Sequence, residues 1–103
     1  MFHVYVIDLD EAVWQDRRFR TANPQRDPAK PCVYVGQTSL TPEERLAQHR
    51  GGKRSNRYVK QFGGDLVREF TGRIRGATRS EAESSERWMA RRLRRMGYGV
   101  WSK

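Results

Sequence analysis

A strand-like run that leads directly into a well-marked helix constrains this chain more than any other feature. Residues 31–38 are rich in β-branched and aromatic side chains and begin with a proline, whose missing N–H does little harm at the start of a strand. Thr41, Pro42 and Glu44 then have the types and spacing of an N-cap, a first helical residue and the closing residue of a capping box. We therefore expect a strand over 31–38 and a helix from residue 42 to about Arg50.

The N-terminal segment 3–9 is also rich in β-branched and aromatic residues and predicts a second strand. Side chains alternate between the two faces of a strand, so Tyr5 and Ile7 share one face. Antiparallel pairing with 31–38 would bring Tyr5 and Tyr34 to the same rim of the sheet. Taken alone, Tyr5 is equally consistent with a plain core aromatic residue.

Polar groups on the strand 31–38 and on the helix that follows it form the first candidate site. Arg45 and His49 are four residues apart, which places both on one helix face and within reach of the same bound phosphate. The same spacing is also typical of a solvated helix face. Gly36 closes the strand and allows its backbone to approach a ligand or a neighbouring helix.

The remaining chain predicts three helices and one weaker strand. The expected elements are a short helix over 11–19 with Val13 and Trp14 inward, a helix over 53–62 capped by Ser55, a strand over 66–70, and a long helix that starts at Ser80, uses Glu83 to close its capping box and ends before Gly97.

A carboxylate interrupts the apolar face of the last helix. At 100° per residue, Ala82, Met89, Leu93 and Met96 form one stripe, and Glu86 falls within it. An unpaired buried carboxylate costs several kcal/mol, so Glu86 requires a cation. We favour a metal ion over the alternative, a buried arginine partner.

Composition favours a polyanionic partner. The 103 residues suit one domain, 1–103, with 21 Lys and Arg against 12 Asp and Glu and a net charge of +9. No apolar run approaches the ~20 residues that cross a bilayer, and the N-terminus lacks the pattern of a signal peptide, so we expect a cytoplasmic protein and no membrane partner. Cys32 is the single cysteine and is expected to be a buried thiol, rather than a zinc ligand with His3 and His49.

Five short motifs, in order along nearly the whole chain, resemble those of the GIY-YIG nuclease superfamily. They are Val4-Tyr5-Val6, Tyr34-Val35-Gly36, the helical segment 44–49 with its arginine and histidine, Ser55-Asn56-Arg57-Tyr58, and Glu86 on the last long helix. The chain departs from the family pattern at His3, which stands at the glycine of the first motif, and in its tail, which carries no asparagine.

The resemblance implies a small α/β (α+β) domain with a three-stranded antiparallel sheet flanked by helices. It also implies hydrolysis of DNA phosphodiesters by water with one divalent metal, Mg²⁺ or Mn²⁺. The implied catalytic residues are Tyr5, Tyr34, Arg45, His49 and Glu86, with Glu86 as the metal ligand, and the residues expected to contact nucleic acid are Gly36, Arg54, Asn56, Arg57, Tyr58 and Lys60.

Two other classes of function remain open from the sequence. One is a non-catalytic, basic nucleic-acid-binding module on the same fold. The other is a protein-interaction domain that uses Trp88 or Trp101 as its anchor. No recognition-helix or zinc-finger spacing is present, so sequence specificity would have to come from loops, DNA shape, dimerisation or a partner protein.

Overall fold

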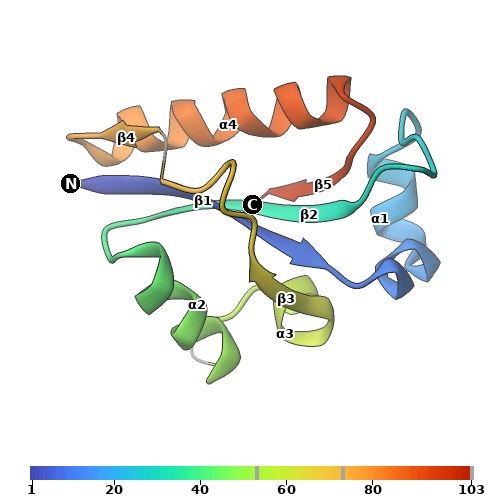
Figure 1. Cartoon of the computed structure of the whole chain (residues 1–103), viewed down its shortest axis with the longest axis horizontal. Coiled ribbons are helices and arrows are strands. Elements are labelled where there is room, and N and C mark those ends of the chain that lie inside the picture. The colour runs from blue at the N-terminus through green and yellow to red at the C-terminus, as the bar shows by residue number, and fades with distance from the viewer. Residues whose placement is uncertain (53, 73, 103) are drawn as a thin grey trace.

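The computed structural model describes residues 1–52, 54–72 and 74–102 and shows a mixed α/β fold (Figure 1). In chain order the elements are β1 (Phe2–Leu9), the 3₁₀ helix η1 (Glu11–Gln15), α1 (Arg17–Ala22), β2 (Cys32–Thr38), α2 (Pro42–Arg50), α3 (Arg57–Phe62), β3 (Gly63–Leu66), β4 (Arg75–Gly76), α4 (Arg79–Arg95) and β5 (Gly99–Ser102). No helix in this part of the chain is long and apolar enough to span a membrane.

The strands form one sheet with the order β3-β1-β2-β5, and the short strand β4 also pairs with β1. β1 and β2 are antiparallel from His3 opposite Thr38 to Leu9 opposite Cys32. β5 runs parallel to β2 but pairs only with residues 32–35. Among the described residues, positions 36–38 therefore have a strand neighbour on one side only, and we call them the open edge of β2.

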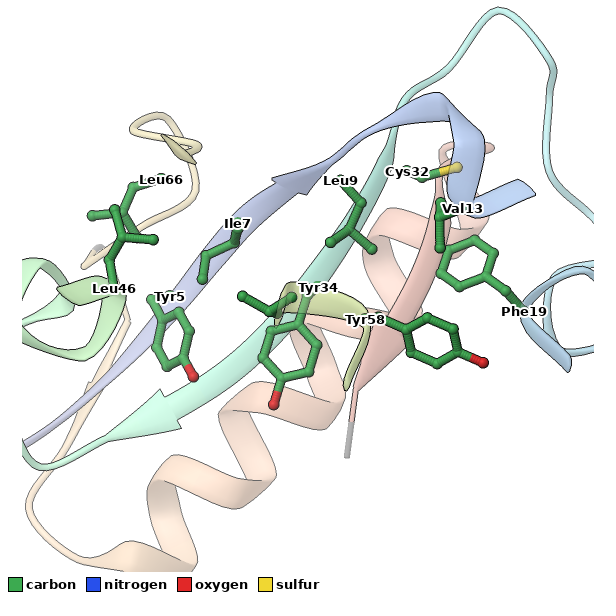
Figure 2. Packing of buried hydrophobic residues seen from close by; sticks show 11 residues of the cluster. Tyr5, Ile7, Leu9, Val13, Phe19, Cys32, Tyr34, Leu46, Tyr58 and Leu66 are labelled. Atoms are coloured by element: carbon green, nitrogen blue, oxygen red, sulfur yellow. The ribbon is translucent and has the colours of Figure 1, made fainter. Parts of the chain in front are cut away.

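The sheet separates two apolar cores, one on each face. α4 covers one face, whereas α2 and α3 lie against the other (Figure 1). The α4-side core contains Val4, Val6, Val33, Val35, Met89, Ala90, Leu93 and Val100. The tyrosine-side core contains Tyr5, Ile7, Leu9, Val13, Phe19, Cys32, Tyr34, Leu46, Tyr58, Val59 and Leu66, most of which are labelled in Figure 2. Strict alternation along β1 and β2 assigns each side chain to its core.

The strand and helix around the first candidate site are confirmed. The Thr41 hydroxyl accepts a hydrogen bond from the Glu44 N–H at 3.1 Å, and the Glu44 carboxylate accepts one from the Thr41 N–H at 3.0 Å. Pro42 occupies the first turn of α2 as expected. These reciprocal bonds fix where α2 begins and so fix which of its residues face the sheet.

The expectation of a three-stranded antiparallel sheet is wrong, because the described sheet has five strands and a parallel pair. β4 has two residues, and β5 follows α4 closely in a glycine-containing tail, so neither has a strong local signal. The strand expected over 66–70 is instead Gly63–Leu66. Gly64 is suited to this position because its backbone packs against the Asp8 side chain, which accepts a hydrogen bond from the Asp65 N–H at 2.8 Å.

The expected N-caps of two helices are also wrong. Thr78, not Ser80, caps α4, because Thr78 and Glu81 have the same Thr/Ser-x-x-Glu spacing and make both capping-box bonds. Asn56, not Ser55, caps α3 by accepting a hydrogen bond from the Tyr58 N–H at 2.9 Å. Lys53, the expected start of that helix, lies outside the described residues.

α4 ends at Arg95, and this removes Met96 from the expected apolar stripe. Met96 is the C-cap and is 40 % exposed, whereas Ala82, Met89 and Leu93 are buried. Gly97 follows with a φ of 94°, a left-handed conformation that glycine adopts without strain.

The segment expected as one helix over 11–19 is broken at Asp16 into η1 and α1. Val13 is buried, and Trp14 packs half-buried against the tyrosine-side core. Arg26, further along, has a buried side chain that pairs with both carboxylate oxygens of Glu11, at 2.6 and 3.0 Å, while its guanidinium lies over the Trp14 ring.

Candidate active site

A cavity of about 410 Å³ lies at the open edge of β2 and collects polar residues from both faces of the sheet. It is lined by Phe2, Tyr5, Tyr34, Gln37, Thr38, Ser39, Leu40, Arg45, Gln48, Arg54, Arg79 and Glu86. β5 ends beside Val35, so nothing among the described strands separates the α4 side from the tyrosine side beyond that point. Residues of α4 and α2 therefore share one cavity although they lie on opposite faces.

Gly36 allows the two tyrosines to approach the open edge. It pairs with Tyr5 across the β1–β2 ladder, and a Cβ at this position would lie 2.6 Å from the Tyr5 Oη. The Tyr5 and Tyr34 ring centroids are 6.2 Å apart, and Figure 2 shows both rings on the same side of the sheet with their hydroxyl groups pointing the same way. The expected meeting of Tyr5 and Tyr34 at one rim is confirmed.

A buried hydrogen bond joins Tyr5 to His49, and the His49 side chain lies in the interior, because the residue is only 1 % exposed. The Tyr5 Oη lies 3.0 Å from His49 Nε2, and His49 Nδ1 lies 3.4 Å from the Ser55 Oγ. Because Ser55 donates its hydroxyl proton to the Asn56 carbonyl at 3.2 Å, its oxygen accepts from His49 Nδ1. In a neutral imidazole this leaves Nε2 as the acceptor, and Tyr5 donates to it.

Burial sets the protonation states of this pair. Desolvation, followed by the positive charge of Arg45, lowers the pKa of His49 to about 4, so its imidazole is neutral at pH 7. Desolvation also raises the pKa of Tyr5, an effect that the neighbouring Arg45 opposes and that Glu86 reinforces. The pKa of Tyr34 is likewise raised, mainly by burial and then by Tyr5 and Glu86. The resting cavity is thus lined by two neutral phenols, and the neutral His49 lies outside the lining, bonded to Tyr5.

Arg45 is held in a fixed position at the cavity wall. Its guanidinium donates to the Gln48 side-chain oxygen at 3.1 Å and to the Arg54 carbonyl at 2.8 Å. Arg54 has a φ of 53°, which turns the chain back toward α2. Because these contacts orient the side chain before any ligand arrives, little conformational entropy remains to be lost on binding an anion.

Glu86 is 6 % exposed and contributes the carboxylate of the cavity. The described residues contain no group of three or more His, Cys, Asp and Glu side chains able to hold a metal ion. Mg²⁺ commonly uses only one or two protein carboxylates and completes its shell with water and substrate oxygens. Gln37 adds a buried side-chain oxygen with no hydrogen-bond partner in the described structure, so the oxygen-rich lining suits such a cation.

The residues expected to contact nucleic acid are distributed differently. Arg54 lines the cavity, whereas Gly36 is buried beneath it. Tyr58 is buried and donates its hydroxyl to an Asp16 oxygen at 2.9 Å, and Arg57 pairs with the other Asp16 oxygen at 3.1 Å.

Asn56 caps α3, and Lys60 is exposed on α3 away from the cavity lining. Cys32 is buried with its pKa raised to about 11 by desolvation, which fits a buried thiol.

The sequence did not single out Phe2, Gln37 and Arg79, which also line the cavity. Only the alternation along β2, which puts Gln37 on the same face as Val35, offered a signal for any of them.

No protein-family model, curated protein or solved structure significantly matches this chain.

Proposed function

We propose that this protein is a divalent-metal-dependent DNA endonuclease that hydrolyses phosphodiester bonds in the cavity at the open edge of β2, as its resemblance to the GIY-YIG nuclease superfamily implies. The observation that carries the proposal is the meeting of Tyr5, Tyr34, Arg45 and Glu86 in one cavity. They come from four different elements, β1, β2, α2 and α4. Phosphoryl transfer depends chiefly on positioning and on stabilising negative charge, and these side chains suit both tasks.

Arg45 binds and stabilises the reacting phosphate. Its guanidinium is planar and permanently charged, and it can donate to two phosphate oxygens at once. The contacts with Gln48 and the Arg54 carbonyl hold it at the cavity wall. Charge that develops on the phosphate oxygens in the transition state therefore meets a donor that is already in place.

Tyr5 orients the attacking water through its hydroxyl oxygen, while His49 fixes the direction of the Tyr5 O–H. The Nε2 lone pair of neutral His49 accepts the Tyr5 proton at 3.0 Å, which leaves the phenol oxygen as an acceptor toward Arg45, Tyr34 and the attacking water. With the pKa of Tyr5 raised and that of His49 lowered, the proton stays on Tyr5 in the resting site. Tyr34, beside Tyr5, positions the phosphate or the water.

Glu86 would hold the divalent cation, with the Gln37 side chain lining the same wall. A cation bound there supplies positive charge that screens the phosphate and lowers the pKa of nearby hydroxyl groups. Glu86 is the one carboxylate among the described residues that line the cavity, whose other charged groups are arginines 45, 54 and 79.

The partner that this charge distribution favours is DNA. The net charge is +9, and arginines 45, 54 and 79 all line the cavity. Contacts of this type bind a phosphate backbone without reading its sequence, so binding should weaken steeply with added salt.

Cleavage of supercoiled plasmid in Mg²⁺, Mn²⁺ or EDTA tests the proposal, with Glu86→Gln and Arg45→Ala beside the wild type. Glu69→Gln is the matched control, because this exposed carboxylate lies outside the cavity and its replacement makes the same change in charge. We expect nicked or linear product only with metal, from the wild type and the control.

Failure of the wild type to cleave in any metal, together with plasmid retardation that salt reverses, would replace this proposal with the non-catalytic binding module. Wild-type cleavage rates in Glu86→Gln would remove Glu86 from the site.

A further inference from the structure

Within the described residues, the half of the cavity on the α4 side contains one arginine, which the catalytic roles do not use. Arg79 is the first residue of α4 and lines the cavity together with Phe2. We infer that Arg79 and Phe2 form a subsite for the phosphodiester next to the one that is cleaved, so that one nucleic-acid strand crosses the open edge of β2. This inference rests on the proposed function.

Arg79 is exposed and lines the cavity beside an aromatic ring. Its guanidinium lies 5.8 Å from the centre of the Phe2 ring, within the range of a cation–π contact. Among the described residues it makes no ion pair, whereas arginines 26, 50, 57 and 68 each pair with a carboxylate. Its charge is therefore available to an anion in the cavity.

The positions of the three arginines define the path of the nucleic-acid strand across the open edge of β2. Arg45 and Arg54 lie on the α2 side of the open edge, and Arg79 lies on the α4 side. A strand that places one phosphate between Arg45 and Glu86 extends past the open edge in both directions. The neighbouring phosphate on the α4 side then meets Arg79, with Phe2 offering its ring to the attached sugar or base.

Charge in this half of the cavity supports an anion at Arg79. Glu86 is the only carboxylate in the cavity lining within the described residues, and in the proposed function a cation offsets it. Apart from Glu86, the phosphate at Arg79 meets no acidic side chain of the described cavity lining, and Glu83, one turn along α4, lines an adjoining hollow with Gln37, Glu86 and Arg87. A bidentate guanidinium–phosphate contact is position-specific, because it depends on a fixed donor geometry.

An end-labelled oligonucleotide duplex with a single neutral methylphosphonate tests the subsite. Each cleavage band reports which bond lay in the active site, so every bond is compared with distant bonds in the same lane. For the wild type we expect cleavage of the bond adjacent to the methylphosphonate, on one side only, to fall about tenfold relative to distant bonds. That suppression should disappear in Arg79→Ala and be partly restored in Arg79→Lys.

Arg95→Ala is the matched control, since Arg95 is exposed on the same helix outside the cavity. It should retain the full suppression. One-sided suppression that persists in Arg79→Ala, or no suppression in the wild type, would overturn the subsite while leaving cleavage itself intact. Absence of metal-dependent cleavage from every protein would overturn the proposed function, and the subsite with it.

Discussion

Replacing Gly36 by alanine should separate the geometry of the cavity from the stability of the fold. The new Cβ would lie 2.6 Å from the Tyr5 Oη, 2.7 Å from the Tyr5 Cζ and 3.0 Å from the Tyr34 Cε2. Ordinary contact begins at 3.4 Å, so the Tyr5 hydroxyl must move by at least 3.4 − 2.6 = 0.8 Å. β2 cannot give way easily, because Gly36 pairs directly with Tyr5 on β1.

The displacement has different consequences for stability and for cleavage. Overpacking of this kind costs about 1–3 kcal/mol of unfolding free energy. It also disturbs the 3.0 Å bond from Tyr5 to His49, and a misplacement of about 1 Å in a catalytic group can reduce a rate on the order of 100-fold. We expect a folded Gly36→Ala protein with a thermal midpoint lowered by roughly 4–8 °C per kcal/mol and a much larger loss of cleavage.

Gly72→Ala provides the comparison. Gly72 has a φ of 75° and nothing within 4 Å of a Cβ, so its replacement strains the backbone by about 1 kcal/mol without moving a tyrosine. Thermal denaturation and single-turnover cleavage should be measured for both variants. Cleavage by Gly36→Ala within about twofold of the wild-type rate would refute the assignment of Tyr5 to the reacting centre.

Three further perturbations follow from the buried polar groups. Tyr5→Phe leaves His49 Nε2 buried without its donor, so urea unfolding should show a loss of about 1–3 kcal/mol, and an unchanged midpoint would contradict the bond. Asn23→Ala removes the side chain that bonds the Val100 N–H and C=O and the Phe19 carbonyl, so we expect a loss of about 3 kcal/mol and early hydrogen exchange in β5; exchange no faster than in the wild type would argue against this anchor. The pKa of His49 is lower folded, about 4, than unfolded, 6.5, so its contribution to stability is complete above pH 6.5 and is lost as the pH falls toward 4. At pH 5 the wild type should have lost about 2 kcal/mol more than His49→Gln, and parallel pH curves for the two proteins would contradict the shift.

The parts of the fold that the sequence predicted are those with local signals. The capping box at Thr41 and Glu44 involves residues three apart, and alternation along β1 and β2 depends on neighbouring positions. The burial of Glu86 followed from its phase on a long helix, which tolerated the two-residue error in the position of the N-cap of α4. Tyr5 and Tyr34 meet because pairing register alone brings them together.

The parts that the sequence did not predict depend on contacts between distant residues. β5 forms because Val100 and its neighbours pair with β2 and are held by the Asn23 side chain, 77 positions away in the chain. No local pattern distinguishes a buried, anchoring Arg26 from the exposed arginines around it. The α4 half of the cavity brings Phe2 and Arg79 together across 77 positions of the chain, and no local pattern marks either residue as part of a site.

Paramagnetic broadening by Mn²⁺ tests the central claim, that the cavity at the open edge of β2 is the metal-dependent reacting centre. Substoichiometric Mn²⁺ is added to ¹⁵N-labelled wild type with a short DNA duplex, and the amide signals lost first report the site of the ion. The account predicts that signals near Glu86 and positions 36–38 disappear first, and that Glu86→Gln abolishes this pattern. Broadening that begins at exposed carboxylates such as Glu43 or Asp65, and leaves the open edge unaffected, would contradict it.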